Sequence, residues 1–137
     1  MKKHVILGLL LSIFAAPSWG TVSTVQFRCI FPTFSDEAAA QQTQKNDFTG
    51  VYIISTQEDG SMTGLLSGSI GASELVVLQG VGILNLLEIT PVGIINITTL
   101  QPDFEAGTAL VVHSRHIAVP SMDMWSPTQW YGDCVIQ

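Results

Sequence analysis

The sequence predicts an all-β protein, a small antiparallel β-barrel or sandwich of about eight strands preceded by a cleavable signal peptide. Three observations lead to this fold class. Runs of β-branched and aromatic residues alternate with turn-forming residues at a spacing of roughly 8–12 residues. No stretch repeats its apolar residues at the helical period over the length that a crossover between parallel strands needs. Two cysteines lie near the two ends of the chain that cleavage would leave.

The predicted strands follow one another through short connections. Asp-Gly at 59–60 and Pro-Val-Gly at 91–93 favour tight turns, because glycine accepts a positive φ and proline fixes φ. Gly-Val-Gly at 80–82 indicates a bend. The strands are expected at residues 22–31, 51–56, 62–66, 74–79, 83–90, 94–100, 108–119 and 129–136. Such a meander is typical of a barrel or a sandwich.

Two segments between these strands lack a strand pattern. Pro32 is expected to end the first strand, since proline cannot donate to a sheet ladder. The polar stretch 35–47, rich in alanine and glutamine, predicts either a short helix capped by Ser35 or a loop. Residues 120–127, bounded by two prolines, are expected to be irregular.

The first twenty residues have the three parts of a secretory signal peptide. Lys2 and Lys3 give a positive start, residues 5–16 form an apolar centre, and Ser18 and Gly20 place small residues at the cleavage site. The apolar centre is too short for a membrane-spanning helix. We therefore expect residues 1–20 to be removed on export and residues 21–137 to form a single β-rich domain. The mature protein is expected to be periplasmic or secreted, with no membrane span.

The excess of acidic residues in the sequence argues against some classes of binding partner. The chain has five Lys and Arg against eleven Asp and Glu, and loss of the signal peptide would remove two of the five basic residues. The remaining three, Arg28, Lys45 and Arg115, are scattered along the sequence. Phosphate backbones and anionic membrane surfaces repel such a chain, so we expect no nucleic-acid partner.

Cys29 and Cys134 are the two cysteines of the chain. An oxidising compartment favours their pairing. The disulfide would join the first and last predicted strands, and the chain-entropy model gives it roughly 4–5 kcal/mol for a loop of about 100 residues. Adjacent first and last strands are what barrel closure requires, although a sandwich with adjacent termini meets the same condition.

Three stretches of the C-terminal half carry a resemblance. They are residues 86–99, Val-His-Ser-Arg-His at 112–116, and Pro-Thr-Gln-Trp-Tyr-Gly-Asp-Cys at 127–134. These stretches resemble small exported proteobacterial proteins of unknown function, which share the aromatic-Gly-x-Cys ending and a cysteine near the mature start. The resemblance implies export, β structure and the disulfide, and it implies no activity.

The densest polar cluster of the sequence is His113-Ser114-Arg115-His116. In a strand, His113 and Arg115 share one face, whereas Ser114 and His116 share the other. His113 and Arg115 together favour an anion or carboxylate site. The alternative is a solvated strand face with a surface ion pair to the acidic loop at 101–107. No Gly-x-Ser-x-Gly elbow surrounds Ser114, so no catalytic residue is assigned.

A second candidate is a soft-metal site. Met122 and Met124 lie two residues apart, with His113 nearby in the sequence, and thioether sulfur suits Cu(I). His113 and His116 would point to opposite faces of a strand and so cannot share one ion. The alternative is that Met122, Met124 and Trp125 are apolar plugs at one end of the fold.

A third candidate is an aromatic binding surface formed by Trp125, Trp130 and Tyr131. Trp130 and Tyr131 are adjacent in a predicted strand, so one should face inward and the other outward. An outward aromatic residue beside Gly132 would suit a sugar, a peptide or a partner protein. The alternative is one core aromatic and one that covers the disulfide.

These patterns predict a non-enzymatic exported protein, a binding or interaction module of the bacterial envelope that needs no cofactor. It would take an apolar ligand in a barrel mouth, in a cavity lined by residues such as Ile83, Leu87 and Ile95, or would contact another envelope protein. One alternative is a self-associating structural or assembly component that forms homo-oligomers. A more distant alternative is a copper carrier.

Overall fold

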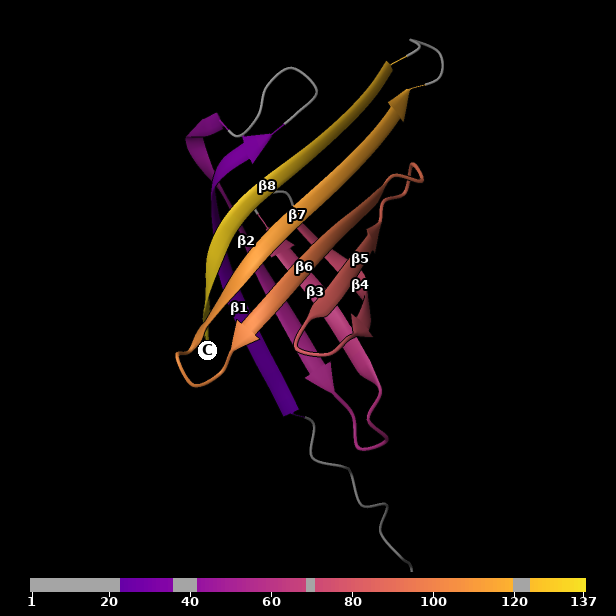
Figure 1. Cartoon of the computed structure of the whole chain (residues 1–137). Helices are drawn as coiled ribbons and strands as arrows, with labels where there is room; N and C mark the ends of the chain where they lie inside the picture. Colours follow the sequence, from indigo (N-terminus) through magenta and orange to yellow (C-terminus); the bar gives the residue numbers. More distant parts are fainter. Residues whose placement is uncertain (1–22, 36–41, 69–70, 120–123) are drawn as a thin grey trace, which may run out of the picture.

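The computed structural model describes residues 23–35, 42–68, 71–119 and 124–137, in which eight antiparallel strands close into one barrel (Figure 1). The structure confirms the all-β fold class and selects the barrel over the sandwich. Residues 1–20, the predicted signal peptide, lie outside the described residues. The strands are β1 (Ser23–Ser35), β2 (Gln42–Thr56), β3 (Met62–Gly68), β4 (Gly71–Gln79), β5 (Leu84–Ile89), β6 (Ile95–Asp103), β7 (Thr108–Val119) and β8 (Met124–Ile136).

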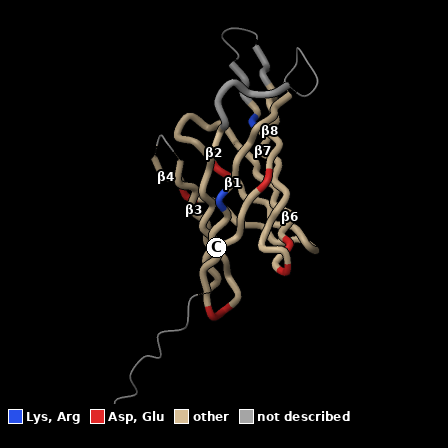
Figure 2. The backbone as a smooth tube through the Cα atoms, turned by 90° about the vertical axis from the view of Figure 1, so that its left-hand side faces the viewer, with Lys and Arg blue, Asp and Glu red and all other residues tan. Residues whose placement is uncertain are grey.

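The strands run up and down in sequence order, and β1 pairs with both β2 and β8. We call the end of the barrel that carries the β5–β6 turn the upper end. The lower end carries the β2–β3 and β6–β7 turns and the C-terminus (Figure 1). Acidic residues mark these two lower turns, Glu58 and Asp59 on one and Asp103 and Glu105 on the other (Figure 2).

Three predicted strand boundaries differ from the structure by four residues or more. Pro32 does not end β1, which continues to Ser35 through a register shift against both neighbouring strands. A shift of this kind tolerates the missing N–H of proline. β2 begins at Gln42, so the helix or loop expected at 35–47 is wrong for Ser35 and residues 42–47, and residues 36–41 lie outside the described part. β8 begins at Met124, so 124–127 are strand and not irregular.

The two predicted tight turns form as expected. Gly60 and Gly93 have φ values of 80° and 83°, in the region that favours glycine. The Gly93 N–H donates to the Thr90 carbonyl at 2.9 Å, and the Ile94 N–H donates to Thr90 Oγ1 at 3.0 Å. These turns fix the register of the β2–β3 and β5–β6 hairpins.

Where the structure describes the side chains, alternate residues of the strands point into the barrel and fill its middle. An eight-stranded barrel has an interior just wide enough for side chains, so the core is a narrow column of large residues. Three polar residues, Asn96, Thr98 and His113, are buried with this column. The buried apolar residues are Phe27, Cys29, Phe31, Tyr52, Ile54, Leu75, Leu86, Leu100, Ala109, Val111 and Cys134.

The barrel closes at a seam between β1 and β8. Cys29 and Cys134 lie directly opposite each other there, with Cα atoms 4.0 Å apart, and form the predicted disulfide inside the barrel. At the register shift, Gly132 lies against the backbone carbonyl of Ile30, where a Cβ would collide with it. The seam therefore depends on a cross-link and on one residue without a side chain.

No helix in the described part of the chain has the length and hydropathy needed to cross a lipid bilayer.

Candidate functional site

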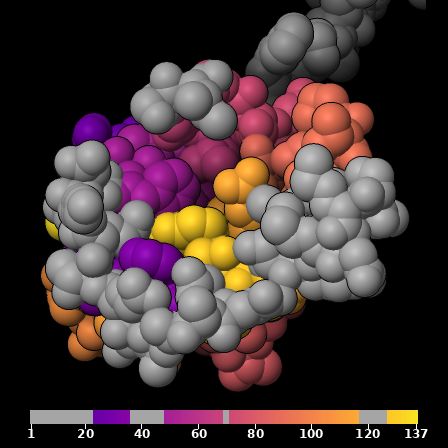
Figure 3. Space-filling model, turned by 90° about the horizontal axis from the view of Figure 1, so that it is seen from above, coloured from indigo at the N-terminus to yellow at the C-terminus, as the bar shows by residue number. Residues whose placement is uncertain are grey.

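A cavity of about 520 Å³ opens at the upper end of the barrel. Seen from above, yellow atoms of β8 lie in the middle of this end, between magenta-purple atoms of β2 and orange atoms of β7 (Figure 3). Gly68 and Gly71 leave the cavity wide on the β3–β4 side, because a Cβ at either position would meet nothing within 4 Å. The lining of this upper cavity is Phe48, Thr49, Leu66, Gly68, Gly71, Ala72, Ser73, Glu88, Thr90, Asn96, His113, Arg115 and Trp130.

A row of three polar residues crosses one wall of the cavity. Glu88 on β5 is directly opposite Asn96 on β6, and Asn96 is directly opposite Arg115 on β7. The row thus holds a carboxylate, an amide and a guanidinium on three neighbouring strands. We call these three residues the polar row.

Asn96 is the most deeply buried member of the polar row, with 8% of its surface exposed. Its Nδ2 donates a hydrogen bond to Glu88 Oε2 at 2.7 Å, which fixes the orientation of the amide. Its Oδ1 is buried and accepts no hydrogen bond from the described residues. A buried acceptor without a partner costs about 1–3 kcal/mol. The fold therefore holds an amide oxygen in the cavity wall that a donor would stabilise.

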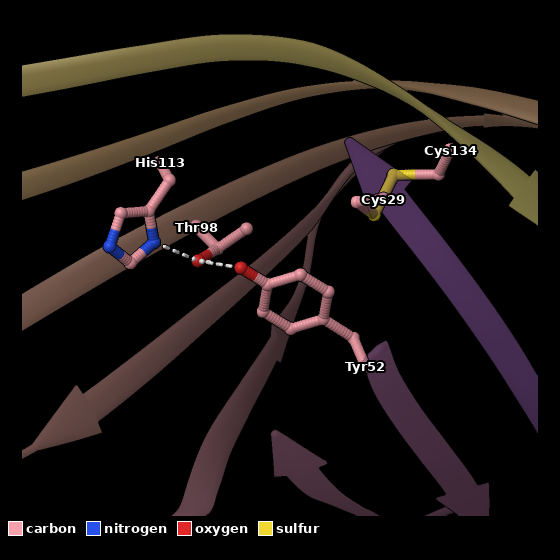
Figure 4. Close-up of a disulfide and its surroundings, with 5 residues drawn as sticks. All are labelled: Cys29, Tyr52, Thr98, His113 and Cys134. Carbon is pink, nitrogen blue, oxygen red and sulfur yellow. Dashed lines mark hydrogen bonds between the residues drawn. A yellow bond between two sulfur atoms is a disulfide. The ribbon is translucent and has the colours of Figure 1, made fainter. Parts of the chain in front are cut away.

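A hydrogen-bonded chain lies one row deeper and joins His113, Thr98 and Tyr52 (Figure 4). The Thr98 hydroxyl donates to the Tyr52 oxygen at 3.3 Å, and Thr98 Oγ1 lies 2.8 Å from His113 Nδ1. Because the one hydroxyl proton of Thr98 goes to Tyr52, His113 Nδ1 must carry the proton in its bond to Thr98. This leaves His113 Nε2 as a hydrogen-bond acceptor on the ring edge that points away from Tyr52 (Figure 4).

Burial favours the neutral forms of His113 and Tyr52, the two titratable groups that this hydrogen-bonded chain contains. Desolvation lowers the pKa of His113 from 6.5 to about 4, with a smaller opposing effect of the negative charge of Glu88. Desolvation raises the pKa of Tyr52 from 10.0 to about 12. At neutral pH the chain therefore supplies an uncharged imidazole to the cavity wall.

Aromatic rings form the wall next to His113. The ring centroids of His113 and Phe48 are 5.6 Å apart, and those of His113 and Trp130 are 5.5 Å apart. Phe48 and Trp130 are 5.9 Å apart, and Phe31 stacks behind Phe48 at 5.0 Å. Such rings offer flat apolar faces and attract cations. The upper cavity therefore combines a polar wall with an aromatic one.

The structure brings together three of the predicted site residues, His113, Arg115 and Trp130, in the upper cavity. His113 and Arg115 share the inner face, as the strand alternation predicted. The predicted acidic loop at 101–107 lies at the opposite end of the barrel, and its first three residues, 101–103, are strand β6 and not loop. The ion pair expected between that loop and these residues is therefore wrong.

Among the candidates whose side chains the structure describes, His116 and Tyr131 do not line this cavity. His116 is exposed outside the barrel, and the Tyr131 hydroxyl donates to Gln129 at 2.8 Å on the outer face. Met124 and Trp125 begin β8 and pair with Val119 and Ala118 of β7. Met122 lies outside the described residues, and among those described no three His, Cys, Asp or Glu side chains gather as metal ligands.

Sequence reasoning missed Glu88, Asn96, Thr98, Tyr52 and Phe48 as site residues. The alternation of residues 94–100 does place Asn96 and Thr98 on one face. Nothing in the sequence shows that this polar face is turned inward, because the neighbouring Ile95 and Ile97 suggest the reverse. In the structure Ile95 is 45% exposed on the outer face.

A second, apolar cavity of about 280 Å³ opens at the lower end. Ile83 lines it, as predicted, whereas Leu87 and Ile95 belong to the outer face of the barrel, so the predicted lining is wrong for these two residues. The lining is Val25, Phe27, Ile54, Thr56, Met62, Gln79, Gly80, Gly82, Ile83, Leu84, Pro102 and Phe104.

The chain matches no protein-family description, and no curated protein or solved structure is significantly similar to it. What the structure itself defines is a small closed β-barrel of eight antiparallel strands with a cavity at its upper end.

Proposed function

We propose that this protein is an exported binding module that takes a small organic ligand in the upper cavity. The observation that carries the proposal is the buried Asn96 Oδ1, which accepts no hydrogen bond from the described part of the chain although Asn96 lines an open cavity. Folding leaves such an atom unpaired at a cost of about 1–3 kcal/mol. A ligand with an N–H or O–H group there would recover this energy on binding.

The shape and lining of the cavity support a small-molecule ligand. Its volume of about 520 Å³ is within the range of roughly 300–1,000 Å³ found for ligand sites. Aromatic side chains supply most of one wall, and a few polar groups converge on the other, which is the usual composition of such sites. The ligand expected from this lining is more polar than the apolar one that the sequence suggested.

The hydrogen bonds that join His113, Thr98 and Tyr52 support a binding function and give less support to a catalytic one. The Thr98 hydroxyl is next to an imidazole, but Thr98 is buried and does not line the cavity, so a ligand cannot reach it. The low pKa of His113 makes it a weak proton acceptor at neutral pH. The chain is therefore suited to holding the ring of His113 in place.

Export is supported by the disulfide and by the sequence of residues 1–20. A cross-link buried inside the barrel at Cys29 and Cys134 needs an oxidising compartment to form and persist. The periplasm or the cell exterior meets this condition.

A fragment screen on the isotopically labelled, oxidised protein tests the proposal. We expect some small polar aromatic compounds to shift backbone amide resonances at residues of the upper cavity in NMR spectra. The variant Ser73→Trp, which fills the cavity, should lose these shifts, and Ser67→Trp on the exposed outer face of β3 should keep them. The proposal fails if no compound perturbs the cavity, or if Ser73→Trp binds as the wild type does.

Self-association is a second candidate, favoured by an apolar patch on the outer face of β4–β6. Val76, Ile89 and Ile95 are 51%, 64% and 45% exposed there, and contiguous patches of this kind mark interaction sites. Light scattering after gel filtration should give a dimer or larger mass for the wild type and a monomer mass for Ile89→Lys. A monomeric wild type at high concentration would exclude this function.

A further inference from the structure

We propose that the ligand of the upper cavity is a small zwitterion with an apolar ring, such as an aromatic amino acid. Its ammonium group would bind at Glu88 and Asn96 Oδ1, its carboxylate at Arg115, and its ring against Phe48 and Trp130. This inference rests on the function proposed above and names the chemical class of its ligand.

The acceptor side of the polar row fits an ammonium group. Glu88 Oε2 and Asn96 Nδ2 already share a hydrogen bond, so the carboxylate and the amide lie side by side. Asn96 Oδ1 is a buried acceptor with no donor among the residues that the structure describes. A primary ammonium has three N–H donors on one atom and can satisfy two neighbouring acceptors at once. Hydrogen bonds from a charged donor are also about twice as strong as neutral ones.

The donor side of the polar row fits a carboxylate. Arg115 lies directly opposite Asn96 on β7, on the other side of Asn96 from Glu88. Two strand spacings, roughly 10 Å, separate the backbones at Glu88 and Arg115. Glu88 is bound to Asn96, and no ion pair joins it to Arg115. The guanidinium at the exposed mouth is therefore available to the carboxylate of a ligand.

The balance of charge in the polar row selects a zwitterion over a simple ion. Glu88 and Arg115 carry opposite charges, so together they give the cavity no net charge at neutral pH. A ligand with only an ammonium group would meet the positive charge of Arg115, and one with only a carboxylate would meet Glu88. A ligand that carries an ammonium group and a carboxylate on the same carbon can place the first toward Glu88 and the second toward Arg115.

The aromatic wall of the cavity favours a ligand that also carries an aromatic ring. Phe48, Trp130 and His113 have mutual centroid distances of 5.5–5.9 Å and line the cavity beside the polar row. An offset or edge-on contact with such rings favours another aromatic ring. Since His113 is neutral, it adds no charge that would oppose the ammonium group.

Three probes that share a phenyl ring and a two-carbon chain test this inference by calorimetry. They are phenylalanine, with both charges, phenethylamine, with the ammonium alone, and 3-phenylpropionate, with the carboxylate alone. We expect phenylalanine to bind at least about tenfold more tightly than either of the others, which corresponds to about 1.4 kcal/mol.

Single substitutions test the acceptor side and the donor side of the polar row separately. Glu88→Gln should abolish the preference for phenylalanine over 3-phenylpropionate, because the ammonium no longer meets a carboxylate. Arg115→Gln should abolish the preference over phenethylamine. Glu74→Gln and Arg28→Gln change exposed charges outside the polar row and should leave both preferences as they are.

Equal affinity for the three probes, or tightest binding of a singly charged probe, would overturn the inference. If fragments bind in the upper cavity but none of the three probes does, the zwitterion assignment is wrong and the binding function stands. If no compound of any class binds there, both are wrong.

Discussion

The β1–β8 seam and the upper cavity lie in the same narrow barrel but differ in how completely their buried groups are paired. At the seam, the disulfide is fully buried and Gly132 lets two backbones touch. In the upper cavity, the buried Asn96 Oδ1 has no donor among the described residues, and desolvation lowers the pKa of His113 to about 4. The contacts at the seam are made within the chain, whereas in the cavity Asn96 Oδ1 accepts no hydrogen bond from the described residues.

This difference indicates that the seam raises the free energy of unfolding and that the unpaired polar group of the upper cavity lowers it. Polar groups buried without full pairing reduce the free energy of unfolding, and they persist where function uses them. Changes at the seam should therefore lower stability and leave the chemistry of the cavity in place. Changes in the cavity should alter binding and have small or even favourable effects on stability.

Removal of the disulfide is expected to have the largest effect. Cys29 and Cys134 are 105 residues apart in the sequence, so their cross-link strongly restricts the unfolded chain. The double variant Cys29→Ala/Cys134→Ala should lose about 4 kcal/mol of unfolding free energy in urea titrations. A loss below about 1 kcal/mol would show that strand pairing alone closes the seam.

Gly132→Ala should cost about 3 kcal/mol, since its Cβ would collide with the backbone carbonyl of Ile30 and the two strands would have to separate. Gly68→Ala is the matched control, because a Cβ there meets nothing within 4 Å. Urea unfolding of both variants gives the comparison. Equal stability of the two would mean that the seam yields easily at this point.

Acidification should weaken the protein through His113. Its pKa is 6.5 when unfolded and about 4 when folded, so the unfolded state binds the proton first as the pH falls. The contribution is complete above pH 6.5 and decreases as the pH falls from 6.5 to 4, by about 3 kcal/mol. His113→Gln should flatten this part of the pH profile of unfolding, and His116→Gln, an exposed outer residue, should not.

Asn96→Leu should have the smallest and an opposite effect. The substitution removes Asn96 Oδ1, the buried acceptor that is unpaired among the described residues, and it also removes one hydrogen bond to Glu88. We expect the free energy of unfolding to rise by about 1 kcal/mol. Thermal unfolding measures the change. A clear loss of stability would show that the bond to Glu88 is worth more than the unpaired oxygen costs.

Much of the fold could be predicted from residue patterns. Each of the eight expected strands lies within or close to an observed one, and the turns at Gly60 and Gly93 are where expected, because tight turns depend on local φ. The site was harder to predict. Glu88 and Asn96 are eight residues apart in the sequence and meet because the β5–β6 hairpin sets them opposite each other.

By itself, the sequence determined the strand content, the turns and the shared face of His113 and Arg115, since these follow from alternation and from local backbone preferences. Only the tertiary structure decided that this face is turned inward, that Phe48 and Trp130 meet there, and that Asn96 Oδ1 is left without a donor. The reason is that a strand with apolar residues on both faces can turn either one to the core. Closure of the barrel fixes which face is buried.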